Sequence, residues 1–184
     1  MSYKLPLTTT STNGSLYVGT GLSVSNGIVS VNPSAALEYG YFFSTQTQTN
    51  PVAGAINTVT FDNTGITNGA ILASGTRITV GTTGTYTLTS IVQFDKPSGT
   101  AINIDIWLRL NGVDVANSNI NTPIANTVSG ATAASNYTLL MNTADYLELC
   151  WQCANINGNL LAIPAQTGPV RPASPSVRTT IVQL

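Results

Sequence analysis

Apolar and polar residues alternate along most of this 184-residue chain. Because successive side chains of a β-strand point to opposite faces, such alternation predicts half-buried strands. The clearest cases are residues 84–94, where Tyr86, Leu88 and Phe94 share one face, and residues 102–110, where isoleucine or leucine occupies every second position. No stretch repeats apolar residues at helical spacing over a dozen positions. The sequence therefore predicts an all-β protein.

Further strands are predicted wherever short apolar runs are bounded by glycine, asparagine or proline. They comprise residues 39–43, 59–61, 71–74, 77–80, 113–115, 137–141, 146–153 and 177–184. Turns are predicted at Asp95–Gly99 and at Asn111-Gly112, the latter a strong signal for a two-residue hairpin. Residues 154–176, which contain four prolines, form a long predicted loop. Loops of this length inside compact domains are often functional.

The first 35 residues differ from the rest, being small, polar and rich in glycine. Leu22 and Val24 alternate with serines, Asn26-Gly27 predicts a tight turn, and a strand resumes at Ile28. A lone hairpin of this size is marginal in water, so it needs partner copies or another surface. The pattern resembles one repeat of the triple β-spiral shafts of viral fibres, with a flexible linker as the alternative. We therefore predict an N-terminal attachment or shaft-like segment (1–35) followed by a head domain (36–184).

The composition is unusual, with 7% charged and 42% hydrophobic residues. An average domain has about 25% charged residues. Low charge with high apolar content argues against disorder and predicts a rigid β protein whose outer faces are uncharged or covered by copies of itself. The net charge of −1, with no cluster of lysine or arginine, argues against nucleic-acid binding, which requires clustered cations. No apolar run approaches the ~20 residues of a membrane-spanning helix, so membrane insertion is not expected.

Catalytic and metal-binding chemistry is sparse. The chain has no histidine, and its seven acidic residues show no paired spacing. Cys150 and Cys153 lie in the alternating segment 147–153, where residues three apart point to opposite faces, so free structural cysteines are predicted. We predict no enzyme activity, no cofactor and no metal. A glycosidase whose carboxylates come from distant strands is the remote alternative.

Five segments in the second part of the chain occur in an informative order. They are Tyr39–Phe43, Gly84–Leu88, Leu108–Gly112, Ala144–Leu149 and Thr179–Leu184. An aromatic first strand, a Gly-x-Tyr strand, a strand ending at Asn-Gly, an Ala-Asp strand and a closing strand resemble the C1q/tumour-necrosis-factor-like jelly roll. The resemblance covers the chain from Glu38 to its end. It implies a jelly-roll sandwich of about ten antiparallel strands that assembles as a homotrimer around aromatic and apolar side chains.

Asp105, Trp107 and Arg109 alternate on the face opposite the isoleucine and leucine row of residues 102–110. Tryptophan and arginine are enriched at interface hot spots. Arginine can stack on a neighbouring tryptophan, and a nearby aspartate can hold its guanidinium. We predict an intersubunit or ligand contact here, with a solvated sheet face as the alternative.

Tyr39, Tyr41 and Phe43 also alternate on one face. We interpret them as packing in the core or along a trimer axis, with a sugar-stacking platform as the alternative. Trp151 shares a strand face with Leu147 and Leu149, which we assign to the core.

The resemblance implies a function in binding and assembly. No collagen-like stalk, signal-peptide core or membrane anchor is recognised in the sequence, which favours the viral versions of the fold. We therefore expect a virion structural protein, assembled in the host cytoplasm: a trimeric head or tail fibre, or a capsid decoration protein. Its N-terminal segment would bind capsid or other virion proteins, and its head is a candidate for contact with a host-surface glycan or receptor. The alternatives are a lectin-like receptor-binding module that reads sugars through residues 154–176, and a bacterial surface or spore-coat C1q-like protein.

Overall fold

The structure is a computed structural model that describes residues 22–25, 28–31, 36–125 and 129–184. The chain divides into two compact units, Met1–Ala36 and Leu37–Leu184. In the first unit, β1 (Leu22–Ser25) pairs in antiparallel fashion with β2 (Ile28–Val31). These are the two strands of the predicted hairpin, and the Asn26-Gly27 turn lies outside the described residues.

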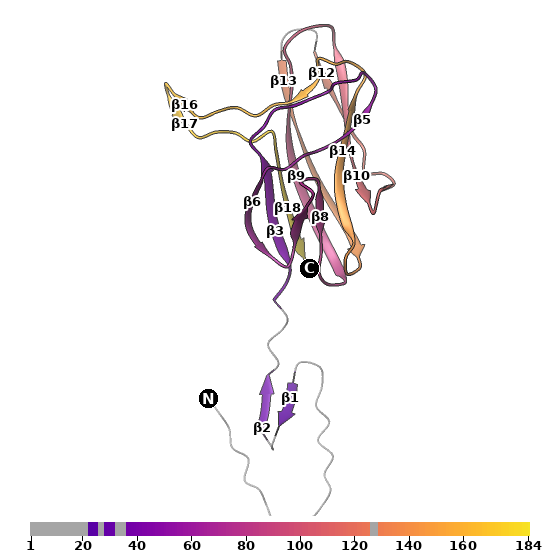
Figure 1. Ribbon diagram of the computed structural model, residues 1–184, viewed down its shortest axis with the longest axis vertical. Coiled ribbons are helices and arrows are strands. Elements are labelled where there is room, and N and C mark those ends of the chain that lie inside the picture. Colours follow the sequence, from indigo (N-terminus) through magenta and orange to yellow (C-terminus); the bar gives the residue numbers. More distant parts are fainter. Residues whose placement is uncertain (1–21, 26–27, 32–35, 126–128) are drawn as a thin grey trace, which may run out of the picture. The chain divides into compact units, whose positions relative to one another are not determined.

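The second unit, the head, is a sandwich of two seven-stranded antiparallel sheets (Figure 1). We name each after its longest central strand. The β9 sheet runs β4-β15-β9-β18-β3-β6, with β13 also paired to β9. Its strands are β3 (Tyr39–Ser44), β4 (Gln48–Thr49), β6 (Asn63–Asn68), β9 (Gly84–Lys96), β13 (Ser129–Met141), β15 (Asn159–Leu160) and β18 (Val177–Gln183).

The β10 sheet covers the other side of the core. It runs β11-β10-β14-β8-β7, with β12 also paired to β10 and β5 to β14. Its strands are β5 (Ile56–Thr58), β7 (Ile71–Ala73), β8 (Arg77–Thr79), β10 (Ile102–Leu110), β11 (Val113–Asp114), β12 (Ile120–Ile124) and β14 (Tyr146–Cys153). A separate small hairpin is formed by β16 (Gln166–Thr167) and β17 (Val170–Arg171).

The core lies between the two sheets and follows the period-two pattern of the sequence. In the β10 sheet the predicted apolar row is buried at Ile104, Ile106 and Leu108. In the β9 sheet, β3, β9, β13 and β18 contribute buried side chains to the core. The largest of the buried side chains are Trp151, Tyr86, Phe42 and Phe94. Burial of such side chains removes roughly 150–250 Å² of aromatic surface each from water, so they dominate the stability of the head.

Of the two turns predicted in the head, one is found where the sequence placed it and the other begins later. Asn111 and Gly112 both have positive φ angles, 52° and 80°, and they join β10 to β11 with Leu110 opposite Val113, as the Asn-Gly signal predicts. The turn predicted at Asp95–Gly99 begins later, because β9 continues through Lys96.

Lys96 is fully buried at the end of β9. Its ammonium donates hydrogen bonds to the carbonyl oxygens of Gly99 (3.2 Å) and Thr100 (2.7 Å), and also to that of Ala125. A buried charge is tolerated only when it is hydrogen-bonded, and these three acceptors meet that need. Lys96 thereby ties the β9–β10 connection to the segment that follows β12.

Several strand assignments differ from the sequence prediction. The strand β6 and the short strands β4, β5, β15, β16 and β17 were not predicted, and the last three lie within the predicted loop 154–176. Residues 59–61 form no strand, although Val59 and Phe61 are buried, because the paired residues of this region are the preceding three in β5. β13 begins at Ser129 rather than at residue 137, and pairs with β9 along its full length. β12 was not predicted, because its sequence Ile-Asn-Thr-Pro-Ile offers a proline, which is tolerated at a sheet edge.

Candidate functional site

The outer surface of the β9 sheet carries side chains from its four longest neighbouring strands. We call it the low-charge face, and its residues are Tyr39, Tyr41 and Phe43 of β3, Arg178, Thr180 and Val182 of β18, Thr85, Thr87, Thr89, Ile91, Gln93 and Asp95 of β9, and Thr132, Ala134, Asn136, Thr138 and Leu140 of β13. Among these described residues only Arg178 and Asp95 are charged. The face is therefore made largely of threonine, small side chains and aromatic rings.

The strand register arranges this face in rows. Thr180 lies opposite Tyr41 on one side and opposite Thr89 on the other, and Val182 lies between Tyr39 and Thr87. Cross-strand neighbours of this kind are close enough to make a continuous surface. The rows place the aromatic residues along one side of the face and threonines along its centre.

The structure places the predicted residues Tyr39, Tyr41 and Phe43 on this outer face, while Phe42 of the same strand is in the core. Tyr41 and Phe43 stack with ring centroids 5.3 Å apart. Tyr39 is 40% exposed. The core-packing interpretation of these three residues is therefore wrong, since the strand turns its odd-numbered side chains outward, and a role in contacts between copies stays a prediction.

The outer surface of the β10 sheet has a different chemistry. We call it the charged face, and its defining residues are Arg77, Asp105, Trp107, Arg109, Asp114 and Glu148. Arg77 Nε lies 3.0 Å from Glu148 Oε1, and its guanidinium carbon lies 4.3 Å from the centre of the Tyr146 ring. The hydrogen bond to Glu148 raises the pKa of Arg77.

Arg109 and Trp107 converge on one carboxylate of the charged face. Arg109 Nε donates to Asp114 Oδ1 over 2.6 Å, and Trp107 Nε1 donates to the same oxygen over 2.7 Å. These bonds lower the pKa of Asp114. The guanidinium carbon of Arg109 lies 6.0 Å from the Trp107 ring centre, the outer limit of a cation–π contact.

The carboxylate that holds Arg109 is thus Asp114 and not the predicted Asp105. Asp105 and Arg109 are four positions apart along the same strand, which is too far for a direct bond. Asp105 Oδ1 instead accepts hydrogen bonds from Asn119 (3.0 Å) and Asn121 (2.9 Å). The signal that could have found Asp114 was the Asn-Gly turn, since a two-residue hairpin places Asp114 opposite Arg109.

Cys150 is fully buried although its strand directs it to the outer side of the β10 sheet. Its cross-strand neighbours are Trp107 and Thr58, and burial raises the pKa of its thiol. Cys153 faces the core, and both cysteines are free. The predicted arrangement of the two thiols on opposite faces is therefore observed.

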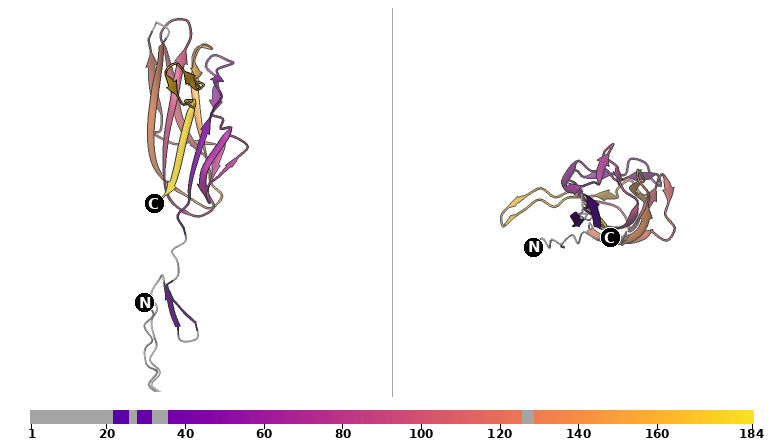
Figure 2. Two further views of the ribbon diagram at one scale, coloured as in Figure 1. Left: turned by 90° about the vertical axis from the view of Figure 1, so that its left-hand side faces the viewer. Right: turned by 90° about the horizontal axis from the view of Figure 1, so that it is seen from below.

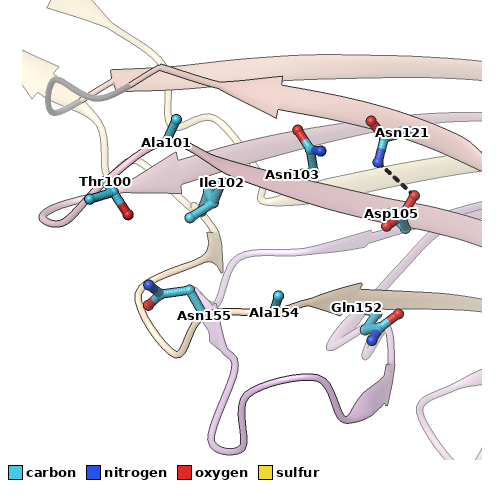
Figure 3. Close-up of a pocket in the computed structure, with 9 residues that line it drawn as sticks. All are labelled: Thr100, Ala101, Ile102, Asn103, Asp105, Asn121, Gln152, Ala154 and Asn155. Atoms are coloured by element: carbon cyan, nitrogen blue, oxygen red, sulfur yellow. Dashed lines mark hydrogen bonds between the residues drawn. The ribbon is translucent and has the colours of Figure 1, made fainter.

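A polar hollow of about 420 Å³ lies on the charged side of the head (Figure 3). It is lined by Thr100, Ala101, Ile102, Asn103, Asp105, Asn121, Gln152, Ala154 and Asn155. The figure shows the side chains coming from β10 and the segment before it, from β12, and from the end of β14. Its lining includes the first residues of β10. This strand begins at the end of the head opposite the C-terminus (Figure 1).

The lining combines four side-chain amides with one carboxylate and contains no cation. Asp105 is oriented by Asn121, and Gln152 Nε2 donates to the Gly54 carbonyl oxygen over 2.9 Å. Amide groups donate and accept hydrogen bonds at the same time, so this set suits a neutral, hydroxyl-rich ligand better than an anion. Within the described residues no group of three or more histidine, cysteine or acidic side chains is placed to hold a metal ion. The described part of the chain also contains no helix that could cross a membrane.

No protein-family model matches the chain, and no curated protein matches it. Solved structures do match. The crystal structure of murine APRIL at pH 8.5 aligns with 80% of this chain and 99% of that chain, with a TM-score of 0.51 and 13% identity. Murine APRIL at pH 8.0 aligns over the same shares, with a TM-score of 0.52 and 14% identity. At this identity the likeness shows the fold alone, and the chain has the predicted all-β jelly-roll fold of the tumour-necrosis-factor-like type.

Proposed function

We propose that this chain is a virion structural protein whose jelly-roll head assembles as a homotrimer through the low-charge face. The observation that carries the proposal is the contrast between this face and the solvated, ion-paired surface on the other side of the same sandwich. A broad β surface with aromatic rings, threonines and two charges has the composition of an interface core, where charged residues are depleted.

Closed cyclic symmetry is the common outcome when identical chains associate. A trimer would bury three low-charge faces and leave three charged faces in water. Projection of three heads also multiplies weak individual contacts with a host surface through effective concentration. This arrangement suits the tip of a viral head fibre or tail fibre, or a capsid decoration protein.

The assignment to a virion is supported by the order of parts in the sequence. A short paired segment that resembles one shaft repeat, β1 with β2, precedes a jelly-roll head. In this proposal the N-terminal segment binds capsid or other virion proteins.

Light scattering of the purified full chain tests the assembly. The expected result is a single species with three times the chain mass of 19.1 kDa. A monodisperse monomer at micromolar concentration would contradict the proposed homotrimer. Antibodies raised against the head should then label intact virus particles in electron micrographs, and labelling confined to bacterial cell surfaces would favour the spore-coat or surface-protein alternative.

The polar hollow favours a second candidate function, a lectin-like receptor-binding head. The hollow lies on the opposite side of the sandwich from the proposed trimer face, so assembly would leave it open. A glycan array should then detect binding that Asp105→Asn and Asn103→Ala abolish. Asn63→Ala, on β6 of the other sheet, is the matched control and should bind as wild type does. Binding that survives both hollow variants would place the sugar elsewhere.

A further inference from the structure

The small hairpin of β16 and β17 stands away from the rest of the head (Figures 1 and 2). We call residues 164–173 the arm. Gln166 lies opposite Arg171 and Thr167 opposite Val170. At its base, Ile163 and Ser174 exchange two backbone hydrogen bonds of 2.9 and 2.8 Å. The arm is therefore an ordered hairpin rather than an irregular loop.

The arm has little support from its own head. Nine of its ten residues are exposed, the exception being Gln166, whose side chain bonds only the arm's own Pro164 carbonyl. No hydrogen bond in the described chain links residues 164–173 to the remainder of the molecule. Val170, near its tip, is 86% exposed. An isolated two-stranded hairpin is marginal in water, so a hairpin this short needs an external surface to keep it folded.

The point at which the arm leaves the sheet indicates where that surface lies. Gln93 belongs to the low-charge face, and its side-chain Nε2 donates to the carbonyl oxygens of Leu161 (3.3 Å) and Pro175 (2.7 Å). These two residues begin and end the connection that carries the arm. Both legs are thus anchored over the low-charge face, and the arm projects from the side of the head formed by the β9 sheet (Figures 1 and 2).

We infer that the arm clasps a second copy of this chain, so that each head of the assembly holds its neighbour. The inference rests on the proposed trimer, because it uses the low-charge face as the surface between copies. An arm anchored on that face and directed away from it would meet the neighbouring head before it met solvent. Its composition matches this role: Arg171 is its single charge, and alanine, glycine, proline and valine fill most other positions.

An arm-shortened chain provides the first test. Replacing residues 164–173 with Asn-Gly joins Ile163 to Ser174 by a two-residue hairpin turn and leaves the sheets intact. The expected result is a trimer whose subunits exchange at least about tenfold faster than in wild type, since each arm buries the equivalent of one valine or more. Unchanged exchange in a stable trimer would overturn the clasp and leave the trimer proposal standing. A monomeric wild-type chain would overturn both.

A labelling experiment tests the position of the arm directly. Val170→Cys is treated with a bulky maleimide at high concentration, where the trimer forms, and after dilution to monomer. Val113→Cys is the matched control, because Val113 is also on a short hairpin and 70% exposed, but on the other sheet. Both native cysteines are buried and should react slowly. We expect assembly to slow labelling at Val170→Cys about tenfold or more and to leave Val113→Cys unchanged. Equal labelling of Val170→Cys in both states would show that the arm is free.

Discussion

The two outer faces of the head are built on sheets of equal strand number but differ in what covers them. The charged face carries two ion pairs, Arg77 with Glu148 and Arg109 with Asp114. The low-charge face has Thr180 and its neighbours at the centre and no ion pair among its described residues. The charged face is therefore suited to contact with water. The low-charge face instead exposes β-branched and aromatic side chains and lacks the charged residues that usually cover an exposed sheet.

The difference shows that strand alternation alone does not say what an outer face is for. Period-two patterning separates inward from outward residues equally well in both sheets. The distribution of the few charged residues carries the additional information. A chain with 7% charged residues places four of its thirteen charged residues in two ion pairs on one face, which leaves the opposite face suited to contact with a protein surface.

The largest expected effect comes from placing a charge at the centre of the low-charge face. Thr180→Asp would bury an unpaired carboxylate in every subunit, and each buried ion costs several kcal/mol. We expect the dissociation constant to rise at least ~10³-fold and the chain to run as a monomer in light scattering. Thr79→Asp on the charged face, next to Arg77, is the control and should remain trimeric. A trimer that tolerates Thr180→Asp would show that this face is not the interface.

Adjacent residues of β3 sharpen the comparison. Phe42 is fully buried, so Phe42→Ala should lower the free energy of unfolding by about 3–5 kcal/mol. Tyr41 lies on the outer face, and Tyr41→Ala should cost the isolated head only about 1 kcal/mol, mainly the stack on Phe43. The free energy of unfolding is measured by urea titration with Thr180→Asp also present. That variant is expected to be monomeric, so assembly does not contribute to the measured stability. Similar losses for the two variants would contradict the inward and outward assignment.

A smaller effect is expected on the reactivity of the Cys150 thiol, whose cross-strand neighbour on the charged face is Trp107. Trp107→Ala removes the cross-strand neighbour that helps to bury the thiol, so its pKa should fall back toward the ordinary cysteine value. Because the thiolate is the reactive form, labelling by a disulfide reagent should speed up about tenfold. The double variant Trp107→Ala/Cys150→Ser should lose this increase. If it does not, the exposed thiol is Cys153 and the sheet has opened more widely.

Much of this fold is predictable from the sequence, because alternation directly reports burial. The row of residues 102–110 and the Asn111-Gly112 turn needed only local rules. The jelly-roll order followed from the resemblance of five segments. Phe42 was not singled out as the core residue of its strand, because Tyr39, Tyr41 and Phe43 are aromatic as well and nothing local fixes which side of β3 faces inward.

The non-local features of the site were beyond the sequence. Asp105 meets Asn119 and Asn121 only through the pairing of β10 with β12. The arm was predicted as part of a long loop, but its anchorage by Gln93 depends on where β15 and β18 flank β9. Contacts of this kind are set by register between distant strands, which short motifs do not encode.

The smallest expected effect is the acid response of Asp145, in the turn between β13 and β14. Its carboxylate accepts hydrogen bonds from the Asn142 backbone N–H and from Asn111 Nδ2, both at 2.7 Å, which lower its pKa below the ordinary value of about 3.9. A lowered folded-state pKa means that the unfolded chain takes up the proton first as pH falls. The stability contributed by Asp145 is therefore present above about pH 4 and is lost as pH falls through the folded-state pKa. Asp145→Asn should lower the urea midpoint at neutral pH, and the gap to wild type should close toward pH 2. A gap that stays constant from neutral to strongly acidic pH would show that the side chain acts through its shape in the turn and not through its charge.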